Sequence, residues 1–188
     1  TSTAWRWCSP APAISATDAR PMPIRPATAA DHARIVALNA AEVAQTSAMD
    51  AARLAELDAL ACAHWVVETE GEVMAVLLAM DETAAYENDN FRWFAARLPR
   101  FVYIDRIVVD RAAAGRGWGR ALYAALSERA RARGIDAVVG EYNLDPPNPA
   151  SKAFHDRLGF REIGQQHVAG GRKRVSMQLL NLNEGSPS

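Results

Sequence analysis

The segment FVYIDRIVVDRAAAGRGWGRALYAALSERARARG, residues 101–134, decides the fold class of this chain. Residues 101–109 are mostly apolar and β-branched, which is typical of a buried strand. Residues 117–133 carry Leu122, Leu126 and Ala130 on one face, which predicts an amphipathic helix closed by Gly134. A strand, a glycine-rich loop and a helix in this order predict an α/β domain.

The loop of this segment has the properties of an anion-binding site. Gly115, Gly117 and Gly119 stand at the start of the predicted helix. The first turn of a helix has free N–H groups and the positive end of the helix dipole, and glycines let phosphate oxygens approach the backbone. Arg116 and Arg120 can add charge-assisted hydrogen bonds. We therefore predict a pyrophosphate site here.

Two common phosphate-binding motifs do not fit this loop. The nucleotide P-loop ends in Gly-Lys-Ser/Thr, whereas Gly119 is followed by Arg120 and Ala121. A dinucleotide fingerprint has the spacing G-x-G-x-x-G, whereas the three glycines here are each two residues apart. The loop is therefore neither a P-loop nor a Rossmann fingerprint.

Toward the N-terminus, short apolar runs alternate with helical patterns. We expect a strand at Ile24, then a helix capped by Thr28 or Asp31, a second short helix, and strands over residues 65–68 and 73–80. The turn at Glu70-Gly71 predicts an antiparallel hairpin in which the glycine takes a positive φ. The core positions expected on the two helices are Ile35, Leu38, Val43, Leu54 and Leu57.

Residues 81–100 lose these patterns but concentrate aromatic and amide side chains. Long irregular connections often carry function, so one interpretation places Phe91 and Trp93 in a substrate site. The other is a short surface helix whose aromatic side chains turn into the core. The sequence leaves both open.

Toward the C-terminus we expect a strand over residues 137–142, a helix over 149–158 ended by Gly159, and a strand over 160–168. In the last strand Val175, Met177 and Leu179 alternate with polar residues. This alternation predicts that one face of the strand is buried.

The chain resembles the GNAT superfamily of acetyltransferases in two motifs. Residues 116–121, RGWGRA, match the family pattern Arg/Gln-x-x-Gly-x-Gly/Ala at the start of the helix after the fourth strand. Residues 148–160, NPASKAFHDRLGF, look like the family's Asn-x-x-Ala/Ser stretch ending in Gly-Phe. The resemblance covers roughly residues 22–180 and is strongest over residues 103–160.

The resemblance implies a fold and an activity. The fold is α/β (α+β), with a central mixed, mostly antiparallel sheet of about seven strands that splays between strands 4 and 5, flanked by about four helices. The activity is direct transfer of an acetyl group from acetyl-CoA to the primary amine of a small molecule in a ternary complex, without a metal. A protein N-terminus or lysine as acceptor, and a non-catalytic acyl-CoA-binding module, are the alternatives.

The resemblance also assigns site residues. Strand 4 would pair with the pantetheine arm, the loop amides would hold the pyrophosphate, and polar residues after strand 5 would complete the cofactor site. These cofactor-binding candidates are Ile107, Val108, Val109, Gly115, Arg116, Gly117, Trp118, Gly119, Arg120, Ala121, Asn143, Asn148 and Ser151. The candidates for the acceptor site are Phe91, Trp93, Tyr103 and Glu141.

Asp105 and His155 are the candidate catalytic residues. An alkylammonium group is mostly protonated at neutral pH, so a base is useful, and Asp105 lies on the strand that carries a base carboxylate in similar polyamine acetyltransferases. With a period of two, Tyr103, Asp105 and Ile107 would share a face. The alternative is that Asp105 only forms an ion pair with Arg106 or Arg92. His155 stands where many family members have a tyrosine, and it is a candidate acid, base or packing residue.

Composition excludes several other classes of protein. The chain has 188 residues, a net charge of -1 and two cysteines, Cys8 and Cys62, which suit one domain (residues 22–182) in a reducing cytoplasm. Nothing predicts binding to nucleic acid or to a membrane, or a metal site. We expect residues 1–21 and 183–188 to be tails, and the family resemblance makes a homodimer an option.

Overall fold

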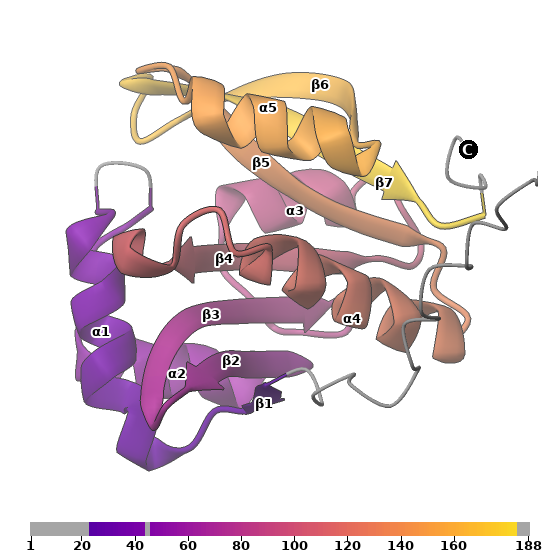
Figure 1. The fold of residues 1–188 in the computed structure, drawn as a ribbon. Helices are drawn as coiled ribbons and strands as arrows, with labels where there is room; N and C mark the ends of the chain where they lie inside the picture. The colour runs from indigo at the N-terminus through magenta and orange to yellow at the C-terminus, as the bar shows by residue number, and fades with distance from the viewer. Residues whose placement is uncertain (1–22, 44–45, 184–188) are drawn as a thin grey trace, which may run out of the picture.

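The computed structural model describes residues 23–43 and 46–183, which form one seven-stranded sheet with helices on both faces (Figure 1). The strand order is β1-β2-β3-β4-β5-β7-β6. The predicted tails, residues 1–21 and 183–188, lie outside the described residues apart from residue 183. The α/β class and the mixed sheet expected from the sequence are confirmed.

The elements follow the predicted order closely. The strands are β1 (Ile24–Pro26), β2 (Ala63–Thr69), β3 (Glu72–Asp81), β4 (Val102–Val109), β5 (Ala137–Asp145), β6 (Arg161–Val168) and β7 (Lys173–Asn181). The α-helices are α1 (His32–Ala41), α2 (Ala51–Leu60), α3 (Asp89–Ala95), α4 (Trp118–Ala132) and α5 (Pro149–Leu158). Two short 3-10 helices cover Ala29–Asp31 and Arg111–Ala113. The described residues thus form five α-helices, where the resemblance implied about four.

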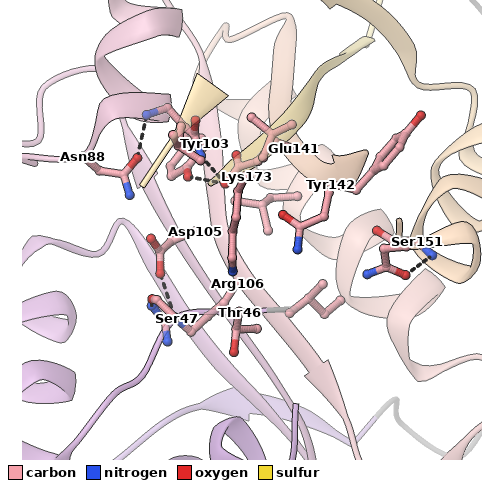
Figure 2. A pocket seen from close by; sticks show the side chains of 18 of the residues that line it. Thr46, Ser47, Asn88, Tyr103, Asp105, Arg106, Glu141, Tyr142, Ser151 and Lys173 are labelled. Carbon is pink, nitrogen blue, oxygen red and sulfur yellow. Dashed lines mark hydrogen bonds and ion pairs between the residues drawn. The ribbon is translucent and has the colours of Figure 1, made fainter. Parts of the chain in front are cut away.

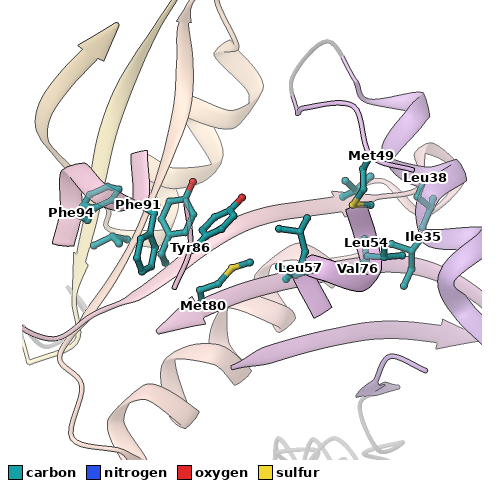
Figure 3. Close-up of a cluster of buried hydrophobic side chains, with 14 of the residues drawn as sticks. Ile35, Leu38, Met49, Leu54, Leu57, Val76, Met80, Tyr86, Phe91 and Phe94 are labelled. Atoms are coloured by element: carbon teal, nitrogen blue, oxygen red, sulfur yellow. The ribbon is translucent and has the colours of Figure 1, made fainter. Parts of the chain in front are cut away.

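Each face of the sheet has its own hydrophobic core. Helices α1, α2 and α3 cover one face, and α4 and α5 cover the other (Figure 1). Figure 3 shows part of the first core, in which side chains of α1 and α2, such as Leu38 and Leu57, pack against β3. In the second core the predicted stripe of α4, Leu122, Leu126 and Ala130, is almost completely buried. Burial of apolar side chains in these two cores holds the sheet between the two helical layers.

Thr28 and Asp31, the two capping candidates of the sequence, close the 3-10 turn Ala29–Asp31 that leads into α1. Asp31 accepts hydrogen bonds from the backbone N–H and the hydroxyl of Thr28, at 2.8 and 3.0 Å, and pairs with Arg25 of β1. Helix α1 ends at Ala41, earlier than the pattern suggested. Val43 therefore lies outside the helix and is 46% exposed, so its predicted core position is wrong.

The hairpin between β2 and β3 has the predicted turn. Both of its central residues take a positive φ, 55° at Glu70 and 80° at Gly71. Positive φ at both positions matches the right-handed twist of the flanking strands. The turn thereby sets the register of β2 against β3.

Residues 81–100 contain α3, and its aromatic side chains turn into the core. Phe91 is 4% exposed and Phe94 is fully buried, and both pack around Tyr103 of β4. Asn88 caps the helix by accepting hydrogen bonds from the N–H groups of Asn90 and Phe91. The structure thus adopts the second of the two interpretations of this segment.

Strand β7 is buried on both faces over its central part, so the prediction of a single buried face is wrong. Ser176 and Gln178 are 0% and 2% exposed, although they lie opposite the apolar face. The reason is that helices cover both faces of the sheet, so the face of β7 that carries Ser176 and Gln178 is also covered. Gln178 Nε2 donates to Ser176 Oγ at 2.7 Å, and Ser176 donates to Glu162, which satisfies these buried polar groups.

A tight contact between Trp93 of α3 and Gly164 of β6 gives a test of the packing. A Cβ atom on Gly164 would lie 2.6 Å from Cζ2 of the Trp93 ring, and Arg97 stacks on that ring at 3.8 Å. We expect Gly164→Ala to lower the free energy of unfolding by roughly 1–3 kcal/mol in urea titrations. In a Trp93→Leu background the same substitution should cost clearly less. Equal costs in both backgrounds would contradict the contact.

Candidate active site

Strands β4 and β5 separate after only two paired positions. They run parallel and pair at Val102–Val138 and Tyr103–Val139, and no further pairs are recorded between them. The register between β3 and β4 shifts at the same level, so that Asp105 is an extra residue between Ile104 and Arg106. Such a bulge bends a strand and increases its twist. The bulge therefore lies where β4 leaves β5.

The opening contains a cavity of ≈ 560 Å³ that passes between the two strands (Figure 2). Its walls come from β4 and β5, from α4 and α5 on one side, and from residues 46–48, the start of α3 and the β6–β7 hairpin on the other. The predicted site residues that line it are Tyr103, Asp105, Ile107, Glu141, Asn143, Asn148, Ser151 and His155. The structure thus brings both catalytic candidates and both halves of the predicted site to one cavity.

Asp105 is held in a closed network. Its Oδ2 accepts a hydrogen bond from Nε of Arg106 at 2.7 Å, and its Oδ1 accepts one from the Tyr86 hydroxyl at 2.5 Å. The side chains of Asp105 and Arg106 are each 4% exposed. Arg106 also donates to Asn39 of α1 and to Ser47. The ion pair that the sequence offered as the alternative role of Asp105 is thus present.

The bulge also changes which β4 residues share a face. Tyr103 belongs to the core under α1, α2 and α3, whereas Ile107 packs with the core under α4. A strict alternation would have put Tyr103 and Ile107 on the same side. The extra residue at Asp105 reverses the alternation beyond it, so the predicted common face is wrong.

Glu141 of β5 is a carboxyl group in this cavity with a buried oxygen that has free hydrogen-bonding capacity. Its Oε1 accepts hydrogen bonds from Asn90 Nδ2 at 2.8 Å and from the Tyr103 hydroxyl at 3.0 Å. Its Oε2 is buried and has no hydrogen-bond partner among the described residues. Burial raises the pKa of Glu141 to about 8, and the nearby charge of Asp105 acts in the same direction.

Asn90 is itself held in place from β6. Gln166 Nε2 donates to Asn90 Oδ1 at 3.0 Å, so the amide of Asn90 is oriented with its nitrogen toward Glu141. Strand β6, helix α3 and strand β5 are therefore joined by two consecutive hydrogen bonds. This arrangement fixes the carboxyl group of Glu141 and leaves only Oε2 unpartnered.

His155 of α5 is buried and paired on both ring nitrogens. Nδ1 lies 2.8 Å from the carbonyl oxygen of Ser151, which can only accept, so Nδ1 carries the proton. Nε2 lies 3.2 Å from the Tyr123 hydroxyl of α4, which donates to it. Burial lowers the pKa of His155, so the ring is neutral in this environment. Tyr123 gave no signal of its own in the sequence, because the neighbouring apolar stripe was enough to predict the helix.

The glycine-rich loop has the backbone geometry of an anion site. Gly115 and Gly117 have φ values of 77° and 83°, which favour glycine, and Gly117 is the N-cap of α4. Gly119 has a packing role, because a Cβ there would lie 3.3 Å from the Phe154 ring. Arg116 and Arg120 are exposed, and the buried Nε1 of Trp118 has no partner among the described residues. Free donors and positive charge therefore gather at the helix start.

Several predicted site residues lie outside the cavity. Phe91 lies in the core, and Trp93 packs on Gly164. Val108 is buried in the first core and Val109 packs against the second. Residues 115–121 form the loop and first turn of α4 beyond the cavity wall. The cavity is also lined by Lys173 of β7, whose position at the start of a strand gave no signal in the sequence.

The profile of the acetyltransferase (GNAT) family matches residues 32–160. This chain belongs to the GNAT acetyltransferase family. The match includes the first core helix, the splayed strands, the glycine-rich loop and the helix that carries His155. The family resemblance read from the two motifs is thereby confirmed.

Solved structures agree with the fold. A Salmonella typhimurium protein, yncA, assigned as an acetyltransferase and solved with its cofactor acetyl-CoA, is 27% identical, with a TM-score of 0.63 over 88% of this chain and 96% of that one. The ribosomal-protein-S18-alanine N-acetyltransferase of Escherichia coli is 16% identical, with a TM-score of 0.64 over 88% and 96% of the two chains. The second likeness shows the fold alone.

A curated relative is the L-methionine sulfoximine/L-methionine sulfone acetyltransferase of Pseudomonas aeruginosa, which is 37% identical over 71 residues. The matched stretch makes up 37% of this chain and 40% of that relative, so less than half of either protein is compared.

The described part of the chain has neither a membrane-spanning helix nor a cluster of metal-binding side chains. No helix there is long and apolar enough to cross a membrane. Over residues 23–43 and 46–183, no group of three or more His, Cys, Asp or Glu side chains is placed to hold a metal ion.

The raised pKa of Glu141 predicts how stability depends on pH. The folded protein keeps a proton that the unfolded chain releases between pH 4.5 and about 8, so the free energy of unfolding should fall as pH rises through this window. Glu141→Gln removes this titration and keeps an acceptor for Asn90 and Tyr103. We expect it to be more stable than the wild type by up to a few kcal/mol near pH 8 and similar near pH 5, in urea titrations at both pH values. The exposed Glu72→Gln is the control, and parallel curves for wild type and Glu141→Gln would contradict the burial of this charge.

Proposed function

We propose that this protein is an acetyl-CoA-dependent N-acetyltransferase that acts on the primary amine of a small molecule. The observation that carries the proposal is the unpartnered Oε2 of Glu141, buried beside a cavity that opens between β4 and β5. A carboxyl group with one free oxygen in such a place can take a proton from an ammonium group.

The residues present fit acetyl-CoA on the side of the sheet that α4 and α5 cover. The amides at the start of α4, with Arg116 and Arg120, would hold the pyrophosphate. The backbone of Ile104 to Ile107 has no strand partner on the β5 side, so its polar groups are available to the amides of the pantetheine arm. When bound, acetyl-CoA supplies a thioester whose acetyl group passes to the amine nitrogen as the carbon–sulfur bond breaks.

Glu141 is a better candidate for the base than Asp105. Both oxygens of Asp105 already accept hydrogen bonds, and protonating it would leave Arg106 as a buried, unpaired cation. Glu141 has a free oxygen and a pKa raised to about 8, which places its proton exchange close to the working pH range. The proton of the acceptor ammonium would pass to Oε2, leaving the nitrogen lone pair free to attack.

Tyr123 and His155 provide an O–H donor on the opposite side of the cavity. The Tyr123 hydroxyl lines the cavity and donates to Nε2 of the neutral His155 ring. The phenol hydroxyl has a single hydrogen, so a thiolate that leaves on this side is stabilised when the Tyr123 hydroxyl turns that hydrogen from Nε2 of His155 to the sulfur. We assign this pair the role of stabilising the leaving sulfur.

A small-molecule acceptor is favoured over a protein acceptor by the curated relative, which acetylates methionine derivatives. The carboxyl oxygen that would receive the proton is also fully buried, so the amine must enter the cavity to reach it. A module that binds acyl-CoA without catalysis would not need this carboxyl group.

Acetyl-CoA binding can be tested by calorimetry with two charge reversals on α4. Arg120→Glu places a negative charge in the first turn of α4. The charge interacts favourably with the helix dipole, so the helix should stay folded, but it repels phosphate. We expect it to weaken acetyl-CoA binding by about 10- to 100-fold. Arg129→Glu reverses the same charge in the last turn of α4 and should bind normally. Equal affinities in the wild type and both variants would contradict the proposed phosphate site.

The role of Glu141 can be tested by activity and its pH dependence. Glu141→Gln should lower kcat/KM by about 100-fold or more while acetyl-CoA binding is unchanged. The wild-type profile should rise with pH through an apparent pKa of about 8, and this limb should disappear in the variant. Asp105→Asn is the comparison, and we expect it to lower the melting temperature by unpairing Arg106. Full activity of Glu141→Gln together with loss of activity in a folded Asp105→Asn would instead identify Asp105 as the base.

A further inference from the structure

Lys173 brings a positive charge to the acceptor side of the cavity. In the β5–β7 register, Glu141 lies opposite Met177 and Asn143 opposite Val175. Lys173 follows in the same alternate series on β7, so it emerges on the face of the sheet that carries Glu141. Its side chain lines the cavity and extends into it in the direction of Arg106 and Thr46 (Figure 2).

The charge of Lys173 is not compensated by the residues described around it. No hydrogen bond or ion pair joins the side chain of Lys173 to another described residue, whereas Arg106 is occupied by Asp105, Asn39 and Ser47. The other acidic groups that line the cavity are Glu141, whose raised pKa keeps it mostly protonated at neutral pH, and Asp89, which is exposed at the start of α3. No carboxylate among the described residues is therefore paired with Lys173 on this side of the cavity.

The spacing of Lys173 and Glu141 suits a small molecule with two charged ends. Four residues along β7 separate the level of Glu141 from Lys173, which is roughly 13 Å between backbones. Both side chains line the same cavity, so one small bifunctional molecule in it can contact both. The hydroxyl of Ser47, whose oxygen accepts from Arg106, has its own hydrogen free to donate on the same side.

We propose that the acceptor is an amino acid, whose amine is presented to Glu141 and whose carboxylate is bound by Lys173. This inference rests on the proposed function, and it narrows the acceptor to amines that carry a carboxylate. A second ammonium group would meet the Lys173 charge at this position, so polyamines should be poor acceptors.

The test compares acceptors that differ only in the carboxylate. The probes are L-methionine sulfone and the standard L-amino acids, their uncharged carboxamides, the matching amines that lack the carboxylate, and spermidine. Each is assayed with acetyl-CoA under identical conditions. We expect at least one amino acid to exceed its own carboxamide in kcat/KM by about 10-fold or more, mainly through a lower KM.

Substitution of Lys173 tests whether this residue causes the preference for an amino acid over its carboxamide. Lys173→Met keeps the length of the side chain but removes its charge, and it should raise the KM for the amino acid by about 10- to 100-fold while the carboxamide is affected little. Lys173→Arg should retain most of the preference. The matched control is Lys152→Met on the exposed side of α5, since Lys152 is the only other lysine in the chain.

The outcomes separate this inference from the function on which it rests. Higher activity with carboxamides, simple amines or spermidine than with every amino acid would overturn the amino acid assignment and leave the acetyltransferase intact. An amino acid preference that survives in Lys173→Met would overturn the role of Lys173. Absence of both acetyl-CoA binding and acetyl transfer to any probe would instead refute the proposed function.

Discussion

The separation of β4 from β5 after two paired positions is the constraint on which the rest of this structure depends. Strands inside a sheet normally satisfy each other's backbone groups, and here two neighbouring central strands do not. The sheet tolerates this because each half is complete on its own outer side, with β1 to β3 beside β4, and β6 and β7 beside β5. The two helical layers hold the halves together. A cavity in the middle of the sheet follows directly, and it is where we place the proposed chemistry.

The charged groups near this opening divide into two kinds. Asp105 and Arg106 neutralise each other and, through Asn39, Ser47 and Tyr86, fasten α1 and its following loop to β4. Removing one partner of such a buried pair leaves an uncompensated charge, so the pair is a structural device. Glu141 and Lys173, in contrast, both line the cavity, and each has a polar side-chain end without a partner among the described residues. The fully paired groups Asp105 and Arg106 thus form part of the wall of the site, whereas the unpaired ends of Glu141 and Lys173 are available to a ligand.

The sequence predicted the donor half of this molecule much better than the acceptor half. The strand, the glycine-rich loop and α4 are local features. They are set by strand propensity, by positive φ at Gly115 and Gly117 and by the apolar stripe on α4, and all of these are visible in a short stretch of sequence.

The choice between Asp105 and Glu141 as the base was not visible in the sequence, because it depends on contacts between residues far apart in the chain. Asp105 is occupied by Tyr86, and Glu141 is raised in pKa by burial that no local pattern reports. The bulge at Asp105 is equally hidden, since apolar runs flank Asp105 and Arg106 on both sides and no glycine marks the position. Lys173 became a candidate only when the strand register placed it on the same face of the sheet as Glu141.

The two sides of the cavity are made by different parts of the chain. Residues 46–48, the start of α3 and the β6–β7 hairpin form the acceptor side, while α4 and α5 form the other. Insertions, deletions and substitutions in the first set can therefore accumulate without disturbing the second. Proteins that share this fold can keep the same acyl donor while the acceptor changes. We therefore expect new acceptor specificities to arise first in those three segments.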